Sequence, residues 1–296
     1  MRAEEAMLRH DGVVRVADYP ELRSAWSRQA QLKKVVRALP GVVVDAALVR
    51  DPVAWMRAVY AWDPNAVVAG RAAASLTFAP GLSVTLVSVY TDSRLADRGP
   101  IRFRHHALES ELTAWVGDLR VTTPAATGLT AALDGDFEPA TAALRLSLTK
   151  VGDLTECARR LRVRPRIRVS EVLRDLSGNP WSVAEVQAHR LLRGAGVTGW
   201  VGNYPVVLQG SRYVIDLAFP RSKVAFEINS FEFHSSKQAM MRDAGRANAM
   251  LAAGWRSYVL MPTQITDYPE ETLDFIRVVV RQRDQRSRGI RASEIF

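Results

Sequence analysis

Short apolar runs and turn residues alternate along the last third of the chain. Two runs, 213–219 and 224–229, flank a Pro-Arg-Ser-Lys turn, and a segment rich in Arg, Ala and Met leads to a third run at 256–261. Apolar runs of this length between turn residues are typical of strands, and the longer intervening segment is typical of a helix. The pattern therefore predicts strand, strand, helix and strand over 212–263.

Two carboxylates interrupt these predicted strands. Asp216 lies inside the first run and Glu227 lies inside the second. A carboxylate in an otherwise apolar strand is unfavourable unless it is paired, hydrogen-bonded or bound to a metal. Because a short turn joins the two runs, we expect the carboxylates on adjacent strands, where they form a candidate metal-binding pair.

The first forty residues show a different pattern. Residues 3–10 are helix-like, Asp18 can cap a helix over 20–26, and Ser27 can cap a second helix over 27–39. Pro40 and Gly41 then end this helix before an apolar β-segment. The order of helix, turn, basic helix and β-segment is typical of a winged helix-turn-helix.

The polar face of the predicted second helix carries the candidate DNA-binding residues. They are Arg28, Gln29, Gln31, Lys33, Lys34 and Arg37. In a recognition helix, Arg and Gln read base edges in the major groove while Lys contacts phosphates. The alternative interpretation is the solvated face of an ordinary amphipathic helix.

The middle of the chain has no catalytic signature. It predicts helices over 52–62 and 64–76, strands over 82–90 and 119–122, and a further helix from Pro124. The most basic stretch follows, and it predicts two helices separated by a break at Pro165. A sugar-phosphate contact and a solvated linker are both consistent with this stretch.

Composition narrows the class of protein. The chain has 296 residues, a formal net charge of +9 and a pI near 10.1, which favours a polyanionic partner. Cys157 is the single cysteine, so an internal disulfide and a cysteine-based zinc site are excluded. The first residues are charged and no apolar run approaches the roughly 18 residues of a membrane helix. We therefore expect a cytoplasmic protein without membrane contact.

A predicted helix over 182–196 precedes the strand region. Ser182 and Glu185 have the spacing of a capping box, which gives Glu185 a structural role. The order of Glu185, Asp216 and then Glu227-Ile228-Asn229 resembles the restriction-endonuclease-like superfamily, and its very-short-patch-repair-endonuclease-like branch most closely. Further landmarks within 182–263 are Phe231 to His234, Arg242-Asp243, Arg246 and Gly254-Trp255-Arg256.

The resemblance implies roles for these residues. In active members of the superfamily the strand acids hold Mg²⁺, which here would involve Asp216 and Glu227, with Glu185 on the leading helix and His234 as general base. The third landmark, often Lys, is here Asn229, which is neither a cation nor a ligating carboxylate. The resemblance thus implies a degenerate nuclease fold kept for binding, with an active Mg²⁺-dependent endonuclease as the alternative.

The layout of the whole chain is similar to that of the AbiE-type abortive-infection antitoxins and related transcription regulators. Members bind their own promoter through a winged helix and counter a nucleotidyltransferase-like toxin. That resemblance implies promoter contact by the six residues between Arg28 and Arg37 identified above.

These patterns and resemblances combine into one expectation. We expect an α+β protein with a winged helix-turn-helix over 1–75, an α/β connecting region over 76–175 and a restriction-endonuclease-like mixed sheet flanked by helices over 176–296. The expected function is DNA binding, as antitoxin and transcriptional autoregulator of a toxin–antitoxin operon, rather than catalysis. The expected partners are promoter DNA, a nucleotidyltransferase-like toxin and a second copy of the chain. No cofactor is needed for DNA binding, and Mg²⁺ enters only with the endonuclease alternative.

Overall fold

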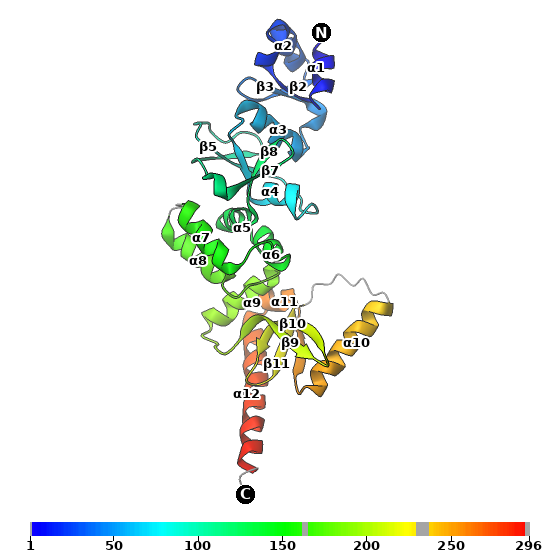
Figure 1. The fold of residues 1–296 in the computed structure, drawn as a ribbon, viewed down its shortest axis with the longest axis vertical. Coiled ribbons are helices and arrows are strands. Elements are labelled where there is room, and N and C mark those ends of the chain that lie inside the picture. The colour runs from blue at the N-terminus through cyan, green and yellow to red at the C-terminus, as the bar shows by residue number, and fades with distance from the viewer. Residues whose placement is uncertain (1, 162–164, 229–236, 294–296) are drawn as a thin grey trace. The chain divides into compact units, whose positions relative to one another are not determined.

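The computed structural model describes residues 2–161, 165–228 and 237–293 (Figure 1). These residues form a mixed α+β fold with three β-sheets. The chain divides into two compact units, Met1–Val172 and Leu173–Phe296. Position 75, an expected domain boundary, lies inside a helix of the first unit.

The first unit begins with two helices and a three-stranded sheet. The elements are α1 (Ala3–Arg9), β1 (Val13–Arg15), α2 (Arg23–Gln31), β2 (Val35–Leu39) and β3 (Val42–Asp45), with 3-10 turns at Val16–Asp18, Pro20–Leu22 and Ala46–Leu48. The sheet is antiparallel with the order β1-β3-β2. Met7 of α1 and Trp26 of α2 pack against Val14 and Val43 on one face. The other face packs on α3 (Pro52–Trp62).

The two helices predicted over 20–26 and 27–39 are wrong: a single helix, α2, runs through Ser27, which is therefore not a cap, and the second half of the predicted basic helix is a strand. Helix α2 ends at Gln31, Lys33 has a positive φ of 57°, and β2 begins at Val35. The reason is pairing: Val36 lies opposite Val44 in an antiparallel hairpin whose turn contains Pro40 and Gly41. Burial of β-branched valines in a sheet outweighs the weak helical spacing of this segment.

The second sheet of this unit is mixed. Its strands are β4 (Val67–Ala69), β5 (Val87–Thr91), β6 (Ile101–His105), β7 (Thr113–Val116) and β8 (Leu119–Thr122), in the order β6-β5-β4-β8-β7. The predicted helix over 64–76 is a strand and a helix instead, because Val67 and Val68 pair with β5 before α4 (Gly70–Thr77) begins. The predicted strand over 119–122 is confirmed as β8.

Four helices complete this part of the chain. They are α5 (Pro124–Leu133), α6 (Glu138–Arg145), α7 (Val151–Leu161) and α8 (Arg166–Leu176). Gly128 of α5 allows close packing on α6, since a Cβ at this position would lie 2.8 Å from Ala140 Cα. The start of α8 just after Pro165 confirms the predicted second helix of the basic stretch.

The second unit is built on a four-stranded sheet. Its elements are α9 (Val183–Gly194), β9 (Val201–Leu208), β10 (Ser211–Phe219), β11 (Val224–Ile228), α10 (Lys237–Ala252), β12 (Arg256–Leu260), α11 (Pro262–Asp267) and α12 (Pro269–Ser293). Strands β9, β10 and β11 form an antiparallel meander, and β12 pairs parallel to β11. The predicted strand–strand–helix–strand order is confirmed.

Helices cover both faces of this sheet. Leu192 of α9, Ile265 of α11 and Ile276 of α12 pack with Phe226 on one face. Met250 of α10 packs on the other face in a second buried cluster. The sheet is therefore the middle of three layers.

Among the described residues, no helix combines the length and the apolar character needed to span a bilayer.

Candidate functional site

Asp216 and Glu227 come together at the β10–β11 pair. Leu217 pairs with Phe226, so one further step of the same antiparallel register places Asp216 opposite Glu227. Directly opposite residues have side chains on the same face of a sheet. Asp216 Oδ2 also accepts a hydrogen bond from the backbone N–H of Ile228 at 2.8 Å. The local sequence thus positions both carboxylates through one strand pairing.

Glu185 reaches the same region from the start of α9. Ser182 caps this helix by accepting the Glu185 N–H at 3.2 Å. The Glu185 carboxylate accepts the Trp181 N–H at 2.8 Å and a hydrogen bond from the Asn203 side chain on β9. The Ser182 half of the expected capping box is present. In the other half, the Glu185 carboxylate accepts the Trp181 N–H and not the Ser182 N–H. Glu185 is also only 5% exposed, so the cap carries a buried carboxylate.

All three carboxyl groups have pKa values above their ordinary range. Burial raises the pKa of Glu185 to about 7, and the charge of Asp216 adds to this shift. Burial raises the pKa of Glu227 to about 7, with further increases from Asp216 and Glu185. Burial also raises the pKa of Asp216 itself, against the opposing effects of Ile228 and Arg246. The three groups therefore influence one another electrostatically, as clustered carboxylates do.

A guanidinium group from α10 binds this cluster. Arg246 Nη2 donates to Glu227 Oε1 at 2.7 Å and to the carbonyl oxygen of Val214 at 2.7 Å. The Arg246 side chain is one-third exposed and the Glu227 side chain is 15% exposed. One carboxylate of the cluster thus has an intramolecular cation as its partner.

The described residues do not fit a divalent metal as they stand. Carboxylate oxygens are suitable ligands for Mg²⁺. However, no group of three or more His, Cys, Asp or Glu side chains that could hold a metal is found among the described residues. Glu227 Oε1 is already bound by Arg246, and Asp216 Oδ2 by the Ile228 N–H. Asn229 and His234 lie outside the described residues.

A second buried polar group lies one turn further along α9. His189 is fully buried, and neither of its ring nitrogens has a hydrogen-bond partner among the described residues. Its ring lies 4.7 Å from that of Trp200, with the Arg193 guanidinium over the indole. Burial, and then the charge of Arg193, lower the pKa of His189 to about 4. His189 is therefore neutral near pH 7.

The six candidate DNA-binding residues are divided between three local structures. Arg28, Gln29 and Gln31 belong to α2, Lys33 and Lys34 form the turn after it, and Arg37 lies on β2. All except the half-buried Gln29 are exposed. The sequence predicted that these six residues form the polar face of one helix, and this prediction is wrong.

Two of these residues contact different helices. Arg37 Nη2 donates to Ser27 Oγ at 3.2 Å, which joins β2 to α2. Lys34 Nζ lies 3.9 Å from Glu4 on α1 instead. The exposed face of α2 is the stripe Ser24, Arg28 and Gln31, at the helical spacing i, i+4 and i+7.

Three residues at or near the carboxylates have roles that the sequence patterns do not predict. Arg246 was only a landmark of the resemblance, and Asn203 and His189 were not identified. The role of Arg246 could have been predicted from its position in the helix that follows the two strand acids. Asn203 and His189 give no such signal, because their environments depend on contacts with distant segments.

No model of a known protein family matches this chain, and no curated protein matches it significantly.

Proposed function

We propose that this chain is a DNA-binding protein whose first unit docks on duplex DNA as a winged helix-turn-helix. The observation that carries the proposal is the order of α1, β1, α2, β2 and β3 with a β1-β3-β2 sheet, which leaves one polar face of α2 exposed. In such domains a helix enters the major groove, and the following hairpin is the wing. The net charge of +9 supports a polyanionic partner.

Because α2 ends at Gln31, the proposed DNA contacts come from three local structures. Arg28 and Gln31 on the exposed stripe of α2 are the residues suited to base edges. Lys33 and Lys34 follow the helix end, where an exposed ammonium suits a phosphate. Arg37 belongs to the wing strand β2, at the side of the hairpin that contacts Ser27.

We further propose the role of antitoxin and transcriptional autoregulator in a toxin–antitoxin operon. The support is the similarity of the chain's layout to AbiE-type antitoxins. The expected DNA is then the chain's own promoter, bound by a dimer, and the expected protein partner is a nucleotidyltransferase-like toxin. Co-expression with such a toxin tests this role: rescue of growth supports it, and unrelieved toxicity contradicts it.

A charge-matched gel-shift experiment tests DNA binding. One variant carries Arg28→Gln, Lys33→Gln and Lys34→Gln; the control carries Arg145→Gln, Arg212→Gln and Arg256→Gln, which are all exposed. Both variants lose three positive charges. The slope of log affinity against log salt should become shallower by about 2 in the first variant only, since Lys33 and Lys34 are the proposed phosphate contacts and each contributes about 0.9. Equal behaviour of the two variants would contradict the proposed surface.

A second candidate function is phosphodiester hydrolysis in the second unit. It is favoured by the convergence of Glu185, Asp216 and Glu227 on a β-meander followed by α10 and a parallel β12. Plasmid incubated with the protein and Mg²⁺ or Mn²⁺ provides the assay. Cleavage that is absent in Asp216→Asn and Glu227→Gln supports this function. Cleavage that survives both substitutions comes from another source.

A further inference from the structure

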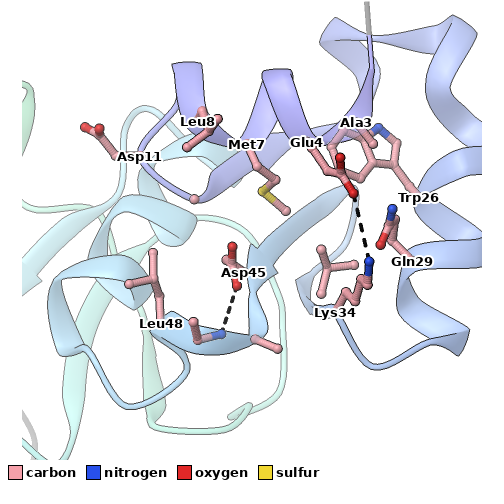
Figure 2. A pocket seen from close by; sticks show the side chains of 14 residues that line it. Ala3, Glu4, Met7, Leu8, Asp11, Trp26, Gln29, Lys34, Asp45 and Leu48 are labelled. Carbon is pink, nitrogen blue, oxygen red and sulfur yellow. Dashed lines mark hydrogen bonds and ion pairs between the residues drawn. The ribbon is translucent and has the colours of Figure 1, made fainter.

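A cavity of about 770 Å³ lies in the first unit between α1, α2 and the 3-10 turn Ala46–Leu48 (Figure 2). Met7, Trp26 and Leu48 contribute to its largely apolar wall. The absence of a side chain at Gly12 allows Leu48 to lie close to the backbone here, because a Cβ at this position would lie 2.3 Å from Leu48 Cδ1. The volume is within the range of about 300–1,000 Å³ that is typical of small-molecule sites.

One buried donor in the cavity wall has no partner. Trp26 is 3% exposed, and its indole N–H makes no hydrogen bond to any described residue. The half-buried Gln29 amide lines the same cavity from the next turn of α2. The cavity thus has polar groups beside its apolar wall.

The charges that line the cavity are mostly acidic. Glu4, Asp11 and Asp45 all belong to its wall. Lys34 lies 3.9 Å from Glu4, and Arg57 lies 3.4 Å from Asp11. Asp45 Oδ1 accepts the Ala47 N–H at 2.9 Å, and Asp45 forms no ion pair with a cation among the described residues, so its second carboxylate oxygen is available to a positively charged group.

We propose that this cavity binds a small aromatic amine. The aromatic ring would lie against Trp26 and Met7, where ring–ring and sulfur–ring contacts are favourable. The ammonium group would lie at Asp45. An anionic ligand is disfavoured by the acidic wall, and a purely apolar ligand leaves the Asp45 charge without a cationic partner.

The site also provides a route for regulation. Trp26 and Gln29 belong to α2, the helix that we propose for DNA contact, so an occupant touches the rear of that helix. A bound amine would then change DNA affinity, and this part of the inference rests on the proposed function.

Isothermal titration calorimetry on the full chain tests the site with three probes of similar shape. The probes are tryptamine, which is cationic, 3-methylindole, which is neutral, and indole-3-acetate, which is anionic. Tryptamine should bind up to about fivefold more tightly than 3-methylindole, which is the upper end of the scale of one partly exposed ion pair, and indole-3-acetate should bind most weakly. Asp45→Asn should abolish the preference for tryptamine while keeping an acceptor for the Ala47 N–H. Asp18→Asn, an exposed acid outside the cavity, is the matched control.

A space-filling variant locates the binding. Ala46→Phe should remove binding of all three probes with the circular dichroism spectrum unchanged; if this variant fails to fold, the Asp45→Asn comparison still decides. Absence of saturable tryptamine binding at millimolar concentration, equal binding of the three probes, or unchanged tryptamine affinity in Asp45→Asn would overturn the proposal. Calorimetry contains no DNA, so its result is independent of the proposed DNA contact. A gel shift with saturating tryptamine then tests the regulatory coupling, and an unchanged DNA affinity would overturn that coupling alone.

Discussion

Arg246 Nη2 lies 2.7 Å from Glu227 Oε1, and the same nitrogen lies 2.7 Å from the Val214 carbonyl oxygen. One side chain of α10 is thereby bonded to both β10 and β11. The guanidinium partly offsets the unfavourable burial of Glu227, whose pKa nevertheless rises to about 7. The contact connects the helix that follows the strand acids to the acids themselves.

Arg246→Gln is expected to destabilise the second unit by about 2 kcal/mol. The substitution removes a charge-assisted hydrogen bond and leaves Glu227 in a half-buried site without its cation. Hydrogen exchange of peptides from β10 and β11, followed against urea, measures the change in this unit. Arg256→Gln, on an exposed arginine of β12, is the control and should stay within about 0.5 kcal/mol of the wild type. Equal effects of the two substitutions would show that the Arg246 contact has no net value.

Removal of Arg246 should also change how the carboxylates respond to a divalent cation. With Glu227 Oε1 free, Arg246→Gln should bind Mn²⁺ more tightly than the wild type does, by about tenfold, because a competing charge is absent. Isothermal titration with MnCl₂ provides the affinity. The double variant Arg246→Gln with Glu227→Gln should lose the gain. A gain that persists in the double variant would place the Mn²⁺ elsewhere.

Glu185→Gln should stabilise the second unit at high pH and leave it unchanged at low pH. The folded pKa of Glu185 is about 7 against an ordinary value of 4.5, so between these values the folded state holds a proton that the unfolded state has lost. The wild-type free energy of unfolding therefore falls as pH rises through this window. Gln does not titrate, and its carbonyl oxygen still accepts from Trp181 and Asn203. The advantage of the variant should be near zero at pH 4.5 and about 3 kcal/mol at pH 8.

Urea unfolding at a series of pH values checks this difference. His189 has a contribution of opposite sign, because its folded pKa of about 4 causes stability to be lost as pH falls below its ordinary value of 6.5. That contribution is common to both proteins and cancels in the comparison. A pH-independent difference between Glu185→Gln and the wild type would contradict the buried, protonated carboxyl group.

Two glycines should prove essential for the packing of His189. A Cβ on Gly178 would lie 2.7 Å from His189 Nδ1, and one on Gly202 would lie 2.5 Å from the Gly178 carbonyl oxygen and 2.6 Å from His189 Cε1. Each substitution to Ala should destabilise the unit by about 2 kcal/mol. Gly194→Ala is the control, since nothing lies within 4 Å of its Cβ position.

The His189→Ala background separates the two glycines. There, Gly178→Ala should lose most of its penalty because its closest neighbour is the imidazole ring. Gly202→Ala should keep its penalty, because its closest neighbour is a backbone carbonyl that cannot move away. Differential scanning fluorimetry of the four combinations provides the readout, and parallel rescue of both glycine variants would contradict this packing.

Where local signals agree, the sequence alone was sufficient. The helix over 52–62 follows Asp51, whose side chain accepts the Val53 N–H, and has Pro52 in its first turn. The strands around Asp216 and Glu227 are apolar runs separated by a four-residue turn. These signals lie within a few residues of the structure that they specify, so no distant partner was needed to interpret them.

The tertiary structure decided the features that depend on distant partners. Val35 became a strand residue because a valine strand follows the Pro40-Gly41 turn, although the preceding residues favour helix. The Arg246–Glu227 pair joins residues 19 positions apart, and Asn203 reaches Glu185 across 18 positions. Burial raises the pKa values of these carboxyl groups, and burial exists only after the sheet and its helices have packed. The sequence thus determined which residues bear the charges, whereas packing determined their partners and protonation.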